Sequence, residues 1–171
     1  TLGPLLLAEA IVGGAQGDDL SASDKVVAGL CHYPGQSQGT GGFERGASNL
    51  ILGPAGTGKS LLTLSFVQSA INRGESAAMF IFDEELGLLF ERSRGLGIDL
   101  PAMADTGRLV IEQIDAAELT PGEFSERVRV CVETHGARTV VIDSLNGYQS
   151  AMPEEQALIL HMHELLQYLN R

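Results

Sequence analysis

The chain has 171 residues, of which 44% are hydrophobic and 19% charged, and these proportions exclude an intrinsically disordered polyampholyte. Acidic residues outnumber basic residues by 22 to 11, and the net charge of −11 counts against binding nucleic acid through its phosphates. At about 150 residues per domain, this length predicts one globular domain with room for a hydrophobic core.

The N-terminal part of the chain carries few structural signals. Residues 5–12 are mostly apolar and predict a short helix, and residues 34–42, which are rich in small and polar side chains, predict a loop or linker. The apolar run at residues 5–15 is interrupted by Glu9, is too short to span a bilayer and follows no basic region, so the sequence predicts neither a membrane anchor nor a signal peptide. The chain begins with Thr1 and ends in a predicted helix, which indicates a piece of a longer protein.

The two cysteines, Cys31 and Cys131, lie far apart in the sequence. Their separation indicates neither a zinc knuckle nor a disulfide framework and favours a cytoplasmic location.

From Ser48 onward, short apolar runs alternate with helical periods, which predicts an α/β protein with a mostly parallel sheet flanked by helices. Four buried strands are expected at residues 49–52, 78–82, 109–114 and 139–142. Helices are expected at residues 59–72, 86–95 and about 155–170, and another begins at Thr120, with Pro121 in its first turn and Glu123 closing a capping box. Cys131 lies on the apolar face of that helix, which predicts an inert buried thiol.

Between the first of these strands and the first helix lies the sequence GPAGTGKS, which matches the phosphate-binding pattern GxxxxGK[ST] at each fixed position. Its glycines let successive backbone amides and the helix N-terminus face the oxygens of a triphosphate. Lys59 would then reach the β- and γ-phosphate oxygens, and the Ser60 hydroxyl would hold Mg²⁺. The residues expected to contact the nucleotide are Gly53, Pro54, Ala55, Gly56, Thr57, Gly58, Lys59, Ser60 and Leu61.

Acidic residues follow two of the other predicted strands. Asp143 comes directly after residues 139–142 and is expected to hold Mg²⁺ through water, which makes it a metal-site residue together with Ser60. The strand at residues 78–82 ends in Asp83, Glu84 and Glu85, and a carboxylate there could orient and deprotonate a water in line with the γ-phosphate.

Two features at these strand ends have more than one interpretation. The acids after residue 82 also suit a helix N-terminus, where the helix dipole favours negative charge. Ser144, which directly follows Asp143, either responds to the γ-phosphate or is only a strand-end hydroxyl.

In combination, GPAGTGKS, the strand end FDEE, the segment RGLGIDL at residues 94–100 and the sequence VVIDSLNGY resemble the KaiC-type ATPases of the RecA superfamily, over about residues 41–171. The resemblance implies a RecA-like P-loop NTPase core, ATP and Mg²⁺ as ligands, slow ATP hydrolysis and, in some members, serine/threonine autokinase activity. It also implies a homo-oligomeric ring, usually a hexamer, with ATP at the subunit interfaces, and signalling proteins as partners.

The same resemblance implies that two adjacent acids after the strand serve catalysis. We expect Glu84 to activate water, Asp83 to be its partner and Lys59 to complete the catalytic set; the family often has Glu at the first position, so Asp83 is a departure.

Both ends of the chain depart from the family pattern. Residues 1–40 do not align and are expected to form a loop-rich segment ahead of a partial ATPase domain at residues 41–171. Family strands that follow the last helix are missing, and one of them normally lies between the P-loop strand and the strand that ends at Asp143. We therefore expect a gap between these two strands, and a poor ATPase if the segment acts alone.

Two other functions are open to test, and a zinc site is disfavoured. The chain could be a nucleotide-gated module that controls assembly with a signalling partner without hydrolysis, or a recombinase relative that moves on DNA, which the net charge of −11 disfavours. His161 and His163 lie two positions apart on a predicted helix and so project to different sides, unlike a zinc-binding pair.

Overall fold

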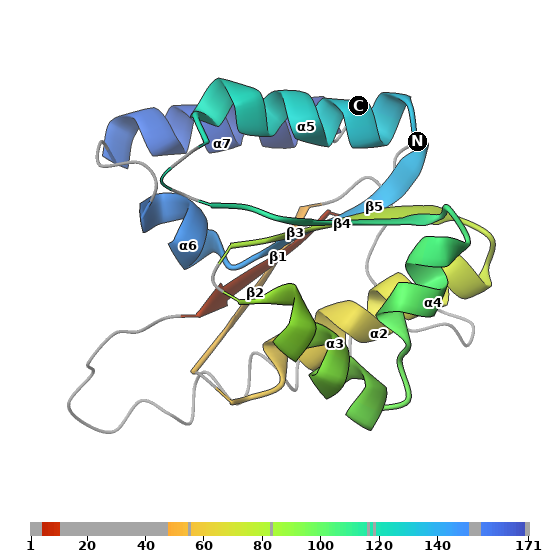
Figure 1. Cartoon of the computed structure of the whole chain (residues 1–171). Coiled ribbons are helices and arrows are strands. Elements are labelled where there is room, and N and C mark those ends of the chain that lie inside the picture. The colour runs from red at the N-terminus through yellow and green to blue at the C-terminus, as the bar shows by residue number, and fades with distance from the viewer. Residues whose placement is uncertain are drawn as a thin grey trace, which may run out of the picture.

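The computed structural model of the protein describes residues 5–10, 48–54, 56–82, 84–115, 117, 119–150 and 155–169. A parallel β-sheet lies between two layers of helices (Figure 1), which confirms the predicted α/β class. In spatial order, the five strands described are β2 (Ser48–Gly53), β1 (Leu5–Ala10), β5 (Ala137–Asp143), β3 (Ser76–Ile81) and β4 (Leu109–Gln113). One face is covered by α2 (Lys59–Asn72), α3 (Leu86–Gly95) and α4 (Leu100–Asp105), and the other by α5 (Pro121–Glu133), α6 (Leu145–Ser150) and α7 (Glu155–Leu169).

The strands β3 and β5 are buried and mainly apolar in their central residues, because each packs against both helix layers. In β3, Phe80 joins the cluster beneath α5, α6 and α7, whereas its neighbours Met79 and Ile81 join the cluster over α2, α3 and α4. In β5, Ile142 and Val141 divide between the two faces in the same way. This alternation follows from the two-residue period of a strand, and it explains why four strands were recognisable as apolar runs.

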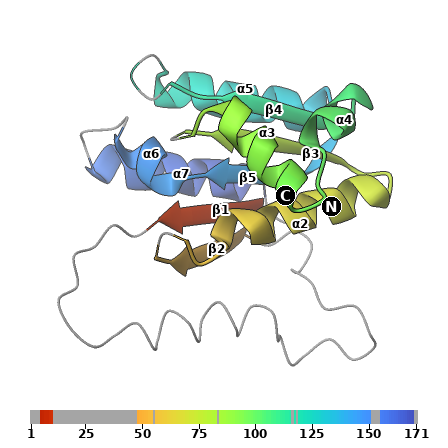
Figure 2. The ribbon, with the colours of Figure 1, turned by 60° about the horizontal axis from the view of Figure 1, so that its bottom comes forward.

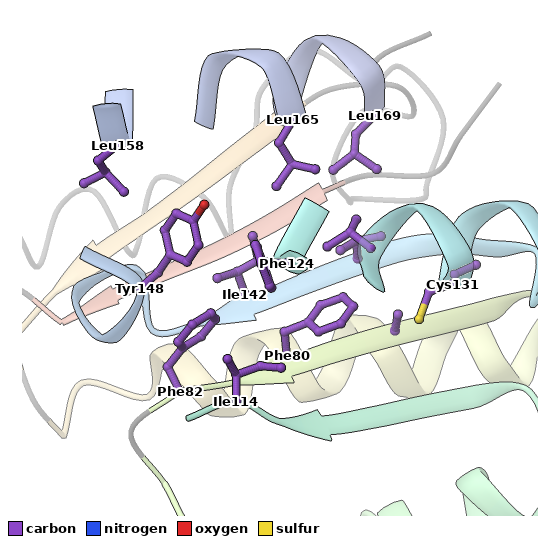
Figure 3. Packing of buried hydrophobic residues seen from close by; sticks show 14 residues of the cluster. Phe80, Phe82, Ile114, Phe124, Cys131, Ile142, Tyr148, Leu158, Leu165 and Leu169 are labelled. Atoms are coloured by element: carbon purple, nitrogen blue, oxygen red, sulfur yellow. The ribbon is translucent and has the colours of Figure 1, made fainter. Parts of the chain in front are cut away.

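An aromatic cluster fixes α5 and α6 over the carboxyl end of β3 (Figure 3). The Phe124 ring lies 5.3 Å from that of Phe80 and 5.4 Å from that of Phe82, both in edge-to-face geometry. Tyr148 of α6 closes the cluster, with its ring 4.9 Å from that of Phe124. Cys131 packs into the same core, which confirms its predicted burial, and burial, aided by the charge of Glu112, raises the pKa of its thiol to about 11, as expected for an unreactive cysteine.

The helices predicted from periodicity are present with closely similar boundaries. The capping box of α5 is formed as expected, since the Thr120 hydroxyl accepts from the Glu123 amide at 3.3 Å and the Glu123 carboxylate accepts from the Thr120 amide at 2.8 Å. The helices α4 and α6 were not predicted, because six residues are too few to establish a helical period. Among the described residues, no helix has the length and apolar character needed to cross a membrane.

The N-terminal segment differs from the helix predicted for it, and it fills the gap that was expected in the sheet. Residues 5–10 form β1 and not a helix, and β1 lies between β2 and β5 (Figure 2), where a gap was expected. It pairs with β2 along six residues and with β5 along four, in parallel register on both sides. A short apolar run fits a helix or a central strand equally well, and here pairing on two sides decides in favour of the strand.

Candidate functional site

The phosphate-binding sequence forms the turn that connects β2 to α2. Gly56 and Gly58 have φ angles of 84° and 87°, values that side chains with a Cβ rarely adopt, so the backbone conformation requires glycine there. Gly58 is the N-cap of α2 and supplies no side-chain cap, and the first turn of α2 contains no acidic residue. The amides at the start of α2 are therefore suited to an anion.

Lys59, the first residue of α2, is folded back onto this turn. Its ammonium group donates to the carbonyl oxygens of Gly53 at 2.6 Å and Pro54 at 2.7 Å, and Lys59 is only 9% exposed. Burial lowers the pKa of Lys59, whereas the charge of Asp143 raises it. The cation is thus held at the mouth of the turn by acceptors that a phosphate oxygen could replace.

Ser60, the residue after Lys59, interacts with Asp143 at the end of β5. The Ser60 hydroxyl donates a hydrogen bond to the Asp143 carboxylate, although the two residues come from α2 and from the end of β5. Burial raises the pKa of Asp143 above its ordinary value of 3.8, the hydrogen bond from Ser60 lowers it, and the charge of Glu84 raises it again. A hydroxyl and a carboxylate side by side are the oxygen donors that Mg²⁺ prefers, so these two residues fit the ion.

Glu84 lies at the same end of the sheet, just beyond β3. Its carboxylate forms two short contacts with the guanidinium of Arg92 on α3, at 2.6 and 2.7 Å. The next acid, Glu85, is the exposed N-cap of α3 and makes no side-chain capping hydrogen bond.

The structure therefore brings four of the predicted residues to one edge of the sheet, where β2, β3 and β5 end. These residues are Lys59, Ser60, Asp143 and Glu84. Leu61 lies beside them on α2 and is 40% exposed. The predicted site residues Ala55 and Asp83 lie outside the described residues.

Comparison with known proteins decides the family of this chain. The family model described as "ATPase: KaiC" matches residues 24–171. The chain belongs to the KaiC ATPase family.

Individual KaiC proteins are similar over part of the chain. It is 30% identical over 118 residues to the circadian clock oscillator protein KaiC of Synechococcus elongatus, a match that covers 63% of this chain and 22% of that protein. It is 31% identical over 118 residues to circadian clock oscillator protein KaiC 1 of a Synechocystis species, with the same coverage of 63% and 22%. The match thus spans about a fifth of the length of these curated relatives.

Two contacts in this KaiC-family chain were not apparent from its sequence. Arg92 follows Glu84 by eight positions, but Glu84 precedes the helix, so helical spacing alone does not pair the two residues. Ser144 accepts a hydrogen bond from the Gly147 amide at 3.2 Å and so caps α6. This contact favours the interpretation of Ser144 as a strand-end hydroxyl, and its response to a γ-phosphate stays a prediction.

The desolvated carboxylate of Asp143 is expected to cost this KaiC-family chain stability. Its raised pKa means that the folded state binds the proton more tightly than the unfolded state, so the cost is complete above the raised pKa and disappears only as the pH falls below 3.8. Asp143→Asn removes this cost and should therefore raise the Tm at neutral pH.

Thermal melts of Asp143→Asn and of the wild type between pH about 4 and pH 8, without nucleotide, check this prediction. The difference in Tm should shrink toward acidic pH, while Mg²⁺-dependent ATP binding should be weaker in the variant at every pH. Asp115→Asn, at an exposed aspartate beyond β4, serves as the matched control and should leave both measurements unchanged. A lower Tm for Asp143→Asn at neutral pH would contradict the prediction.

Proposed function

We propose that this chain binds Mg²⁺-ATP at the turn between β2 and α2 and hydrolyses it slowly. One observation carries the proposal: Ser60, beside the buried Lys59 at the start of α2, is hydrogen-bonded to the strand-end carboxylate of Asp143. A phosphate-binding turn joined to an acidic residue on a different strand is the arrangement by which P-loop proteins bind a nucleotide with its metal ion.

Each residue would have a distinct part in the reaction. The ammonium of Lys59 would exchange its two carbonyl acceptors for oxygens of the β- and γ-phosphates. Ser60 and Asp143 would hold Mg²⁺, directly and through water respectively, and bound Mg²⁺ would neutralise charge on the phosphates. Glu84 would accept a proton from the attacking water, with Asp83 as its partner.

Other properties that the family resemblance implies belong to the same proposal. We infer that the chain acts in the cytoplasm as part of a homo-oligomeric ring with ATP at the subunit interfaces. Autokinase activity is proposed only for a longer form of the protein. Sedimentation of this chain with and without Mg²⁺-ATP tests self-association, and a monomer under both conditions would contradict it for this chain.

Substitution of Glu84 tests the proposed hydrolysis. Glu84→Gln keeps the size and polarity of the side chain but removes its basicity, so we expect kcat to fall by about 10²-fold or more. The affinity for ATP should stay within about twofold, because the carboxylate contacts the attacking water and not the nucleotide in the ground state. Binding of a fluorescent ATP analogue and release of inorganic phosphate measure the two quantities.

Glu85→Gln is the matched control, because it makes the same chemical change one residue further along, at an exposed position. It should retain the turnover of the wild type. Loss of turnover in Glu85→Gln instead of Glu84→Gln would overturn the assignment of the base. Tight ATP binding without turnover in the wild type would contradict hydrolysis and support the alternative function, a nucleotide-gated module that controls assembly.

A further inference from the structure

Arg92 and Glu84 form a paired contact in which each guanidinium nitrogen binds a different carboxylate oxygen. Nη1 of Arg92 lies 2.6 Å from Oε1 of Glu84, and Nη2 donates to Oε2 at 2.7 Å. The side chain of Glu84 is 25% exposed and that of Arg92 is 47% exposed. Two parallel charge-assisted hydrogen bonds define the plane of the carboxylate as well as its position, which a single bond does not.

The pair lies close enough to Asp143, one of the residues proposed to hold Mg²⁺, for both of its charges to act on the pKa of that carboxyl. The charges of Glu84 and Arg92 act on the pKa of Asp143 in opposite directions, Glu84 raising it and Arg92 lowering it, beside the larger effect of burial. Through its contact with Glu84, which follows the end of β3, the guanidinium of Arg92 lies at the edge of the sheet where the strands end. Arg94, on the same helix, makes only a 3.9 Å contact with Asp99 and is 57% exposed.

The helix that carries Arg92 is firmly anchored, whereas Glu84 is not in a regular element. Glu84 lies in the short connection between the end of β3 at Ile81 and the start of α3 at Leu86. By contrast, Leu89 and Ser93 of α3 are 1% and 0% exposed. A contact from α3 therefore transfers the rigidity of the packed helix to a carboxylate in a connecting segment.

Lys59 is engaged elsewhere in this structure. Its ammonium group donates to the carbonyl oxygens of Gly53 and Pro54, and in the proposed function it turns to the phosphates. The orientation of the Glu84 carboxylate thus depends on Arg92 rather than on the lysine of the phosphate-binding turn.

We propose that Arg92 is a positioning residue for ATP hydrolysis, which holds the Glu84 carboxylate in the orientation that accepts the proton of the attacking water. The inference rests on the proposed function. The water oxygen bonds to the γ-phosphorus as the bond from phosphorus to the β,γ-bridging oxygen breaks, the water proton passes to Glu84, and the products are ADP and inorganic phosphate. Each carboxylate oxygen has a second lone pair, so Glu84 can accept that proton while both of its oxygens are bound by Arg92.

The expected signature is a loss of kcat without a loss of affinity. Arg92→Ala should lower kcat by about 10- to 100-fold, since a loosely held base spends little time in the productive geometry. The dissociation constant of a fluorescent ATP analogue should change by no more than about twofold. Arg92→Lys keeps the charge but cannot bind both carboxylate oxygens with two separate nitrogens, so its kcat should lie between those of the wild type and Arg92→Ala.

Arg94→Ala is the matched control, because it removes the same side chain two positions away on α3, where the contact is long and exposed. It should retain the kcat of the wild type. A purely structural role of Arg92 in α3 would lower the Tm, so the melting temperature of each variant is measured as well. For Arg92→Ala we expect no more than a small decrease, because exposed ion pairs contribute little to stability.

A double-mutant cycle with Glu84→Gln decides whether Arg92 acts through Glu84. In the Glu84→Gln background, Arg92→Ala should cause no further loss of kcat beyond about twofold. A multiplicative loss, or an unchanged kcat in Arg92→Ala alone, would overturn the proposal for Arg92 while leaving ATP hydrolysis intact. No hydrolysis by the wild type would overturn the proposed function and this inference with it.

A measurement without nucleotide tests the contact itself. In ¹⁵N NMR spectra, the Nη signals of Arg92 should be resolved in the wild-type protein, because the paired hydrogen bonds slow rotation of the guanidinium group. They should merge with those of exposed arginines in Glu84→Gln and stay resolved in Glu85→Gln. Identical Arg92 signals in the wild type and Glu84→Gln would show that the pair does not form, which would overturn the proposal.

Discussion

Leu7→Pro is expected to separate the strand of the phosphate-binding turn from the sheet and to abolish nucleotide binding. Leu7 is near the middle of β1, where it pairs with Leu50 of β2 on one side and Ile142 of β5 on the other. Proline lacks the amide hydrogen that a ladder needs and is not accommodated in a central strand. Each backbone partner left without a hydrogen bond costs about 1–3 kcal/mol, a large part of the stability of a small domain.

The effect on binding should exceed the effect expected from any single side chain in the turn. In the described part of the sheet, β2 is joined to the other strands through β1 alone. Breaking that link frees Gly53, at the end of β2, from its pairing with Ala10. The turn that follows Gly53 is then no longer held close to Asp143 on β5. Thermal melts and titration with a fluorescent ATP analogue measure the two losses.

Leu7→Val is the control, since valine keeps the backbone amide and suits a strand. We expect a Tm close to that of the wild type and unchanged ATP affinity. Equal stability and equal ATP affinity in Leu7→Pro would contradict the placement of β1 between β2 and β5.

Lys59→Ala is expected to remove ATP binding while leaving the fold intact. The ammonium group is the cation held at the turn, and its charge-assisted bonds to phosphate would have no replacement in alanine. In the absence of nucleotide the substitution removes a buried charge whose pKa is lowered by burial, so the free protein should not lose stability through that charge. Loss of function and retention of the fold are therefore separable in this variant.

A thermal-shift experiment with Mg²⁺-ATP checks this prediction. At an ATP concentration of 100 times its dissociation constant, the ligand stabilises the wild type by about 2.7 kcal/mol, or roughly 5–10 °C in Tm. Lys59→Ala should remain folded without ATP, although loss of the two hydrogen bonds to Gly53 and Pro54 lowers its Tm somewhat, and it should show no shift with ATP. Arg73→Ala, at an exposed basic residue beyond the other end of α2, should keep the full shift. An ATP-induced shift of normal size in Lys59→Ala would contradict the assignment of the turn.

The features recognised from the sequence are those encoded by neighbouring residues. The glycines, Lys59 and Ser60 of the turn act within one short segment, and the capping box of α5 connects Thr120 with a residue three positions later. The strands β3 and β5 were recognisable because burial on both faces makes their central residues a run of apolar side chains. Acidic residues follow two of the predicted strands, and the expectation that they lie at one site needed only the rule that parallel strands end at the same edge of a sheet.

The sequence by itself thus determined the α/β class, the position of the phosphate-binding turn and the family to which the chain belongs. Only the tertiary structure decided that residues 5–10 form a strand, that this strand joins β2 to β5, and that Arg92 holds Glu84. The physical reason is the range of the interactions. Capping and turn conformation depend on a few consecutive residues, whereas strand pairing and the orientation of an ion pair depend on partners that the folded chain alone brings together.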